Sequence, residues 1–189
     1  MKKIAIFASG SGTNFQAILD EVKAGKLSAE IELLVCDRPG AYSIKRANSE
    51  GILPFVFSAK EYVSKEDYET EILQKLKELE VDYVVLAGYM RLIGPTLLKA
   101  YEGRIINIHP SLLPAFPGKD AIGQALNANV SVSGVTIHFV DEGMDTGPII
   151  AQESVLLSEG ETLESLQAKI HEVEHKLYPA VLQSLINRD

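Results

Sequence analysis

Short apolar runs alternate with helical patterns through the first half of the chain. The apolar runs lie at Ile4–Ala8, Ile31–Cys36, Leu53–Phe57, Val81–Ala87 and Ile105–Ile108. Between them, apolar residues recur at helical spacing over about residues 14–24, 42–50, 65–79 and 95–101. Near-continuous apolar strands that alternate with helices are typical of a parallel sheet covered on both faces. The pattern therefore predicts a doubly wound α/β fold.

The pattern changes after Ile108. The elements expected beyond it are a proline-rich turn segment at 111–118, a short helix at 122–127, and strands at 133–140 and 149–157. The acidic, glycine-rich stretch Asp141–Pro148 joins the two strands. Because no long helical segment separates these strands, we expect the late part of the sheet to be partly antiparallel.

One long helix is expected at the end of the chain, over Thr162–Leu185. Its apolar residues Leu163, Leu166, Ile170, Val173 and Leu177 follow three- and four-residue spacing and form one face. Pro179 should kink or interrupt that helix, because proline lacks the N–H of the helical ladder. With no internal repeat or linker, residues 1–189 are expected to form one domain.

Composition and charge exclude several classes of function. The chain is 46% apolar and 23% charged, which suits a protein with a full core. Its formal net charge of −8 argues against a nucleic-acid partner, but a local group of backbone N–H donors can still bind a small anion. The run Ile4–Ala8 is too short for a secretion signal, and no segment is apolar enough to span a membrane. A single cysteine, Cys36, excludes an intrachain disulfide and fits the cytoplasm.

A glycine loop, Ser9–Asn14, follows the first strand and opens the first helix. Unpaired N–H groups and a partial positive charge at such a helix start suit a phosphate. Thr13 or Asn14 could cap the helix or bond the anion, and a tight turn without a ligand is the alternative. Phe15 stands at the position of the third glycine of the dinucleotide fingerprint and no Gly-Lys-Ser/Thr follows, so the loop is neither that motif nor a Walker A loop. Asp37, at the end of the second strand, keeps a nicotinamide-dependent oxidoreductase open as an alternative.

Asn107 and His109 form the second candidate site. Residues two apart in a strand project to the same face, so these side chains should point together at the carboxyl end of the sheet. An amide and a protonated imidazole side by side suit an oxyanion. Asp145, in a loop expected at a sheet end, is the best candidate for a carboxylate that favours the charged ring. The alternative is a core histidine whose ring is hydrogen-bonded to the backbone.

Two short motifs suggest other chemistry, and a third motif is absent. His171–His175 fits the zinc-protease pattern, but a catalytic zinc needs a third protein ligand, and Tyr178 stands where the extended motif has glycine. Asp145-Thr146-Gly147 matches the aspartic-protease triplet, of which those enzymes use two on a mostly β scaffold. No Gly-x-Ser-x-Gly elbow is present. We therefore expect neither a metal site nor a hydrolase of these kinds.

Four runs of residues together carry a resemblance to the folate-dependent formyl transferases. They are Gly10–Asn14, Leu86–Arg91, Asn107–Pro114 and Asp141–Pro148. The third run with a later aspartate is highly specific for these enzymes as a group. The glycine loop and the short chain narrow the resemblance to the family that formylates glycinamide ribonucleotide in purine synthesis. Methionyl-tRNA formyltransferases and formyltetrahydrofolate hydrolases share the Asn-His-Asp set but carry an extra domain.

The resemblance implies direct formyl transfer from 10-formyltetrahydrofolate, as co-substrate, to the amine of glycinamide ribonucleotide, without a metal. It implies that Asn107 and His109 stabilise the oxyanion, that His109 donates the proton, and that Asp145 keeps it charged. The phosphate and ribose residues would be Gly12, Thr13, Asn14, His171 and Glu174. The folate residues would be Lys65, Met90, Arg91, Leu92, Ile93, Asn107, Asp141, Glu142, Gly143 and Met144.

Two residues depart from the family pattern. Lys65 stands where some relatives have a folate-contacting arginine, and His171 stands where relatives often have Gln or Lys. The N-terminal half is expected to bind the phosphate and the C-terminal half the folate. The expected partners are small molecules only, with no nucleic acid or membrane, and the protein could be a monomer or a homodimer.

Overall fold

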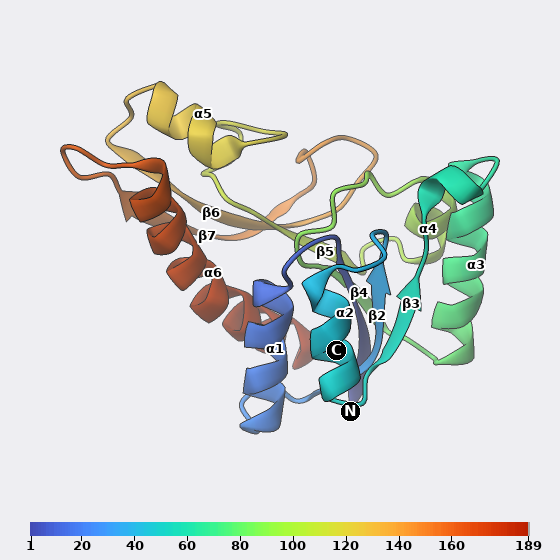
Figure 1. The fold of residues 1–189 in the computed structure, drawn as a ribbon. Helices are drawn as coiled ribbons and strands as arrows, with labels where there is room; N and C mark the ends of the chain where they lie inside the picture. Colours follow the sequence, from blue (N-terminus) through green and yellow to red (C-terminus); the bar gives the residue numbers. More distant parts are fainter. Residues whose placement is uncertain (189) are drawn as a thin grey trace.

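Seven strands join into one sheet in the computed structural model, which describes residues 1–188 (Figure 1). The strands are β1 (Lys2–Ala8), β2 (Ala29–Cys36), β3 (Leu53–Val56), β4 (Tyr83–Leu86), β5 (Ile105–His109), β6 (Val132–Phe139) and β7 (Ile149–Leu156). The helices are α1 (Thr13–Lys23), α2 (Tyr42–Ser49), α3 (Lys65–Glu78), α4 (Pro95–Ala100), α5 (Ala121–Asn127) and α6 (Leu163–Ile186), with a 3-10 turn at Ala59–Glu61. The expected elements are confirmed to within two residues at each end.

The strand order is β3-β2-β1-β4-β5-β6-β7. The first five strands in that order are parallel, whereas β6 runs antiparallel to β5 and β7 antiparallel to β6. This confirms the predicted doubly wound α/β fold with late antiparallel strands. No helix within residues 1–188 is long and apolar enough to cross a membrane.

Two hydrophobic clusters, one on each face of the sheet, explain why the buried parts of the early strands are near-continuous apolar runs. In β1, Ile4, Ile6 and Ala8 pack in one cluster, and Ala5 and Phe7 pack in the other. The first cluster lies under α1, α2, α5 and α6, and the second lies under α3 and α4. A strand buried on both faces has no solvent side for polar residues, so the alternating pattern of a half-exposed strand is lost.

Helix α6 differs from its prediction in two respects. It continues through Pro179 without interruption, because buried residues on both sides of the proline hold the segment against the sheet. Its buried row is also shifted from the expected one, and Leu163 is 39% exposed. The buried row is Leu166, Ile170, Glu174, Tyr178, Leu182 and Ile186. Within it, the Tyr178 hydroxyl contacts the carbonyl oxygens of Leu86, at the end of β4, and Ile106 in β5, at 2.8 and 3.2 Å.

The sheet has its switch point between β1 and β4. The chain leaves β1 toward β2 on one side and reaches β5 from β4 on the other. Two loops therefore meet at the carboxyl ends of these strands, and the Ser9 N–H donates to the Gly88 carbonyl oxygen at 3.0 Å. Open α/β sheets bind their ligands at such a crevice.

Candidate active site

Asp37 sits in a closed hydrogen-bonded group at the switch point. One of its oxygens accepts from the Ser9 hydroxyl at 2.5 Å, and the other accepts from Arg91 Nε at 2.8 Å. Ser9 in turn accepts from the Met90 N–H at 2.9 Å. The carboxylate is buried and both its oxygens are engaged, so it does not face a ribose. The oxidoreductase alternative required that contact and loses its main support.

The first turn of α1 leaves its N–H groups free. The N-cap is Gly12, with φ of +74°, and no side chain caps the helix, so of the two roles open to Thr13 and Asn14 the structure excludes the cap. Within residues 1–188, no hydrogen bond engages the N–H groups of these three residues. A Cβ on Gly12 would lie 2.8 Å from Ser43 Cβ, so a side chain is excluded there. This loop presents backbone donors to the switch point.

Glu174, on the buried row of α6, lies beside the glycine loop. Asn14 Nδ2 donates to Glu174 Oε2 at 3.4 Å, and His171 Nε2 lies 3.8 Å from Glu174 Oε1. Burial raises the pKa of Glu174 to about 7, although the Asn14 contact opposes the shift. The Asn14 Oδ1 atom is buried without a partner in the described structure. The structure thus brings Glu174, His171 and Asn14 together from distant parts of the chain.

The two histidines of the zinc-protease pattern lie side by side on α6. The rings of His171 and His175 stack, with centroids 6.1 Å apart and planes at 23°. No group of three or more His, Cys, Asp or Glu side chains in residues 1–188 is placed to hold a metal ion.

Asn107, His109 and Asp145 meet at the carboxyl end of β5. His109 Nδ1 lies 3.4 Å from Asp145 Oδ2, and its Nε2 lies 2.9 Å from the Phe116 carbonyl oxygen. With acceptors at both nitrogens, the arrangement suits the imidazolium, which donates from both. Asp145 adopts φ of +57° and is held by the Gly118 N–H, which donates to Oδ2 at 2.8 Å. Asn107 and Asp145 are only half-buried, so the group is not sealed in the interior.

His138 completes this group and was missed by sequence reasoning. It lies directly opposite Asn107 in the antiparallel pair of β5 and β6. Its Nδ1 lies 2.8 Å from the Phe139 carbonyl oxygen, which fixes the proton on that nitrogen. Its Nε2, 3.3 Å from Asn107 Nδ2, then accepts one amide N–H and orients the carboxamide. The signal was a histidine in a predicted strand, but only the strand pairing shows which residue it faces.

The loop after β5 is held by side chains from the antiparallel strands. Thr136 Oγ1 donates to the Ser111 carbonyl oxygen at 2.6 Å and accepts from the Leu113 N–H at 3.0 Å. Gln152 Nε2 donates to the Leu113 carbonyl oxygen at 2.9 Å. These bonds fix the loop at its start, and they help to place the Phe116 carbonyl against the His109 ring.

The acidic loop between β6 and β7 has its own internal support. Asp141 Oδ1 accepts from the Thr146 hydroxyl at 2.6 Å and from the Gly143 N–H at 3.0 Å. The Thr146 hydroxyl is the main cause that lowers the pKa of Asp141. Glu142 is exposed and Met144 is 48% exposed, so this loop offers both backbone and an apolar side chain to a ligand.

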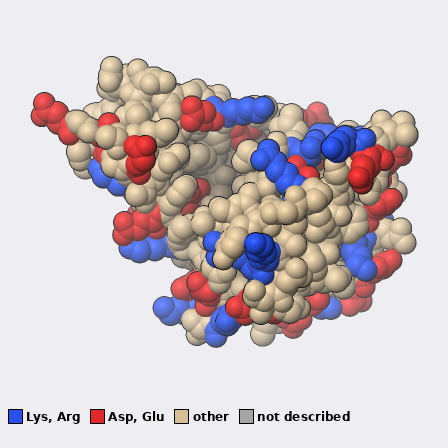
Figure 2. All heavy atoms as spheres, in the orientation of Figure 1, with Lys and Arg blue, Asp and Glu red and all other residues tan. Residues whose placement is uncertain are grey.

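Helix α3 braces the segment after β4. Lys65 Nζ donates to the Leu92 carbonyl oxygen at 2.6 Å, so in this structure its ammonium contacts the loop. The buried Glu69 accepts from the Gly94 N–H at 2.8 Å, and burial raises its pKa. Ile93 is buried, whereas Met90 and Leu92 are 62% and 49% exposed. Figure 2 shows the surface hollowed between the part that carries α5 and the part that carries α1 and α2.

The chain is similar in sequence and in structure to known proteins. The family profile described as formyl transferase matches residues 2–182. A phosphoribosylglycinamide formyltransferase of Bacillus subtilis (strain 168) is 55% identical over 98% of this chain and 95% of its own. The solved structure of glycinamide ribonucleotide transformylase 1 from Geobacillus kaustophilus is similar, with a TM-score of 0.96, 65% identity and coverage of 98% of both chains. A trifunctional purine biosynthetic protein of Drosophila melanogaster is 40% identical over 98% of this chain and 14% of its own length.

Proposed function

The chain belongs to the formyl transferase family, and from this premise we propose that it formylates the amine of glycinamide ribonucleotide in de novo purine synthesis. The formyl donor in this proposal is 10-formyltetrahydrofolate. One observation carries the proposal: the ion pair of His109 and Asp145 lies beside Asn107 at the carboxyl end of the sheet. The free N–H groups of α1 lie at the neighbouring switch point, where a phosphate-bearing substrate would bind.

The reaction needs an oxyanion site and a controlled proton. The substrate amine attacks the formyl carbon, a new C–N bond forms, and the bond to the folate nitrogen breaks. Asn107 has two amide N–H groups, and because His138 takes one, the second is available for the tetrahedral oxyanion. The departing folate nitrogen gains a proton from His109, and the proton that the attacking amine loses restores the charged ring, while Asp145 balances its charge.

We assign the substrates to the loops around this centre. The phosphate lies on the N–H groups of Gly12, Thr13 and Asn14, and the ribose lies against Glu174 and His171. The folate lies along residues 90–93 and 141–144, with Lys65 and Asn107 beside it. The phosphate loop thus belongs to the N-terminal half and the acidic folate loop to the C-terminal half. Two assignments are exceptions: Glu174, in the C-terminal half, contacts the ribose, and residues 90–93, in the N-terminal half, contact the folate. We place this metal-free reaction, with small molecules as partners, in the cytoplasm.

A direct assay tests the proposal. Adding glycinamide ribonucleotide and 10-formyltetrahydrofolate together is expected to change the folate absorbance, whereas either compound alone gives no change. Methionyl-tRNA as the acceptor, and water in the absence of any amine, distinguish the two related activities. Transfer to methionyl-tRNA, or release of formate without an acceptor, in place of reaction with the ribonucleotide would overturn the proposal.

Glu174→Gln is expected to stabilise the protein at pH 8. The folded-state pKa is raised from 4.5 to about 7, so the folded protein holds a proton that the unfolded chain has already released. Stability contributed by this carboxyl is complete below pH 4.5 and is lost as the pH rises toward about 7. The difference between a pKa of 4.5 and one of about 7 corresponds to roughly 3.5 kcal/mol at most.

Urea unfolding at pH 5 and pH 8 measures this effect. Glutamine keeps the shape without the charge, so the variant should lose most of the wild-type fall in stability between the two pH values. Its KM for the ribonucleotide should rise, because the charged acceptor for the ribose is gone. Equal pH dependence of unfolding in the two proteins would contradict the role of burial at this carboxyl.

A further inference from the structure

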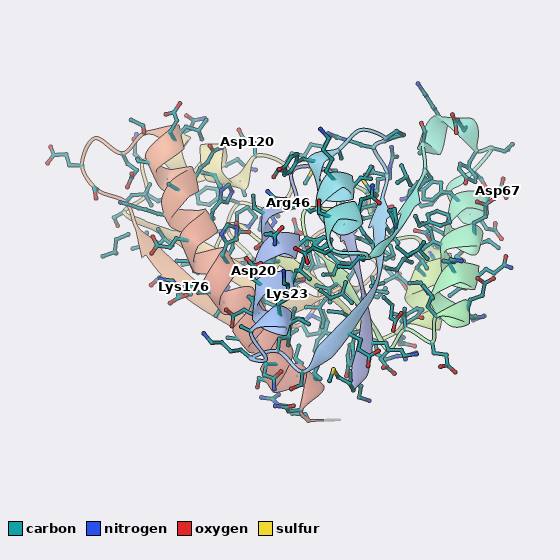
Figure 3. All side chains as sticks on the ribbon, turned by 60° about the horizontal axis from the view of Figure 1, so that its bottom comes forward. Asp20, Lys23, Arg46, Asp67, Asp120 and Lys176 are labelled. Carbon is teal, nitrogen blue, oxygen red and sulfur yellow. The ribbon has the colours of Figure 1, made fainter. Side chains whose placement is uncertain are left out.

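Arg46, on α2, clamps the glycine loop with a planar guanidinium. Its Nε donates to the Ser11 carbonyl oxygen at 2.8 Å, and its Nη1 donates to Gln16 Oε1 at 3.1 Å. The guanidinium carbon lies 4.6 Å from the centre of the Tyr42 ring. Figure 3 shows Arg46 between α2 and the end of α1 that follows the loop. Three contacts in different directions restrict the orientation of the Arg46 guanidinium.

The contact with Ser11 sets the direction of the first free donor of α1. A trans peptide is planar, so its carbonyl and its N–H point in opposite directions. Because the Ser11 carbonyl is turned toward Arg46, the N–H of Gly12 in the same peptide is turned away from it. The loop is also fixed from α2 by the Ser43 N–H, which donates to the Gly10 carbonyl oxygen at 3.1 Å.

Arg46 also supplies uncompensated positive charge. It makes no ion pair with a carboxylate anywhere in residues 1–188, whereas Arg91 is paired with Asp37. A guanidinium has five N–H donors, and only two of those of Arg46 are engaged by the contacts above. In a chain with a formal net charge of −8, such a local cation favours the binding of a dianionic ligand.

We propose that Arg46 is a positioning residue that gives the enzyme its preference for a phosphorylated acceptor. It orients the Gly12 N–H toward the phosphate and places a cation beside the same helix start. The inference deepens the proposed function and rests on it, because that function supplies the phosphate at this loop. According to this inference, one side chain outside the reacting centre makes the enzyme prefer glycinamide ribonucleotide over the riboside that lacks the phosphate.

Kinetics with both acceptors test the inference. Arg46→Met is expected to raise KM for the ribonucleotide about tenfold or more, the change expected when the hydrogen bond from the Gly12 N–H to the charged phosphate is misdirected, with kcat within about twofold. For the riboside, kcat/KM should be unchanged, because no phosphate is present. Arg46→Lys should recover part of the lost affinity, because lysine keeps the charge but lacks the planar guanidinium. Calorimetric titration of the ribonucleotide gives the same comparison without turnover.

Lys45→Met is the matched control. Lys45 neighbours Arg46 on α2, is exposed and carries the same charge, but makes no hydrogen bond to the loop in the described structure. It should leave both acceptors within about twofold of wild type, since exposed charges contribute little. A loss in Arg46→Met that is equal for the two acceptors, or no loss of ribonucleotide affinity, would overturn the inference. A wild-type protein that ignores the ribonucleotide would instead refute the proposed function.

Discussion

His109→Ala is expected to lower kcat for formyl transfer about a thousandfold or more, while the affinities for both substrates stay within a few fold. The ring acts on charge that develops only during the reaction, and such donors and general acids each contribute about 10²–10⁴ in rate. Its contacts in the resting protein are with Asp145 and the Phe116 carbonyl, so removing it takes away little ground-state binding. Steady-state kinetics and calorimetric titration measure the two quantities separately.

A pair of variants strengthens this test. Asn107→Ala should also lose most of its turnover, because its free amide N–H acts on the same oxyanion as His109. The double variant should therefore turn over only slightly more slowly than the less active of the two single variants, because the effects of groups that act as a unit are not additive. Circular dichroism and thermal unfolding serve as the check on folding. A folded His109→Ala protein with more than about a tenth of wild-type turnover would disprove the assigned role.

Asp145→Asn is expected to lower kcat about a hundredfold or more and to move the pH–rate profile toward lower pH. The amide keeps the shape of the side chain, and its oxygen can still accept the Gly118 N–H. It removes the negative charge 3.4 Å from His109 Nδ1, however, and the charged ring is less favoured without it. A reaction that needs the protonated ring is then confined to a more acidic range.

The pH profile distinguishes an electrostatic role from a structural one. Glu159→Gln is the matched control, because this exposed residue lies in the turn before α6, away from the site. It removes the same charge and should leave the profile in place. If Asp145→Asn gave the wild-type profile with only a lower rate, Asp145 would be a residue that shapes its loop and no more.

Most of the fold follows from local pattern. The apolar runs could be assigned to strands because Ile4–Ala8 in β1, Leu33–Cys36 in β2 and all of β4 are buried, with the sheet covered on both faces, which leaves these stretches apolar. Two-residue alternation in β5 is enough to place Asn107 and His109 on one face. The ends of α1, α2 and α4 were recovered because helical spacing there stops shortly before Gly25, Gly51 and Gly103.

The rest depends on which distant segments pack together. The approach of His138 to Asn107 follows from antiparallel pairing of β6 with β5, and periodicity does not specify a partner strand. The engagement of Asp37 by Arg91 could not be foreseen for the same reason, and it removed an alternative that local spacing had left open. In α6, the expected buried face was chosen from apolar residues alone. Glu174 carries a carboxylate, so it was not recognised as part of the buried row.

The four-residue recurrence along α6 has a consequence for how this chain can vary in length. Glu174, which contacts the side chain of Asn14, and Tyr178, which contacts the sheet through its hydroxyl, stand one helical turn apart. Deleting or inserting one residue between them would turn one against the other by about 100°. Homologous chains can therefore exchange side chains along this helix, but gaps in their alignment belong before Thr162 or after Ile186.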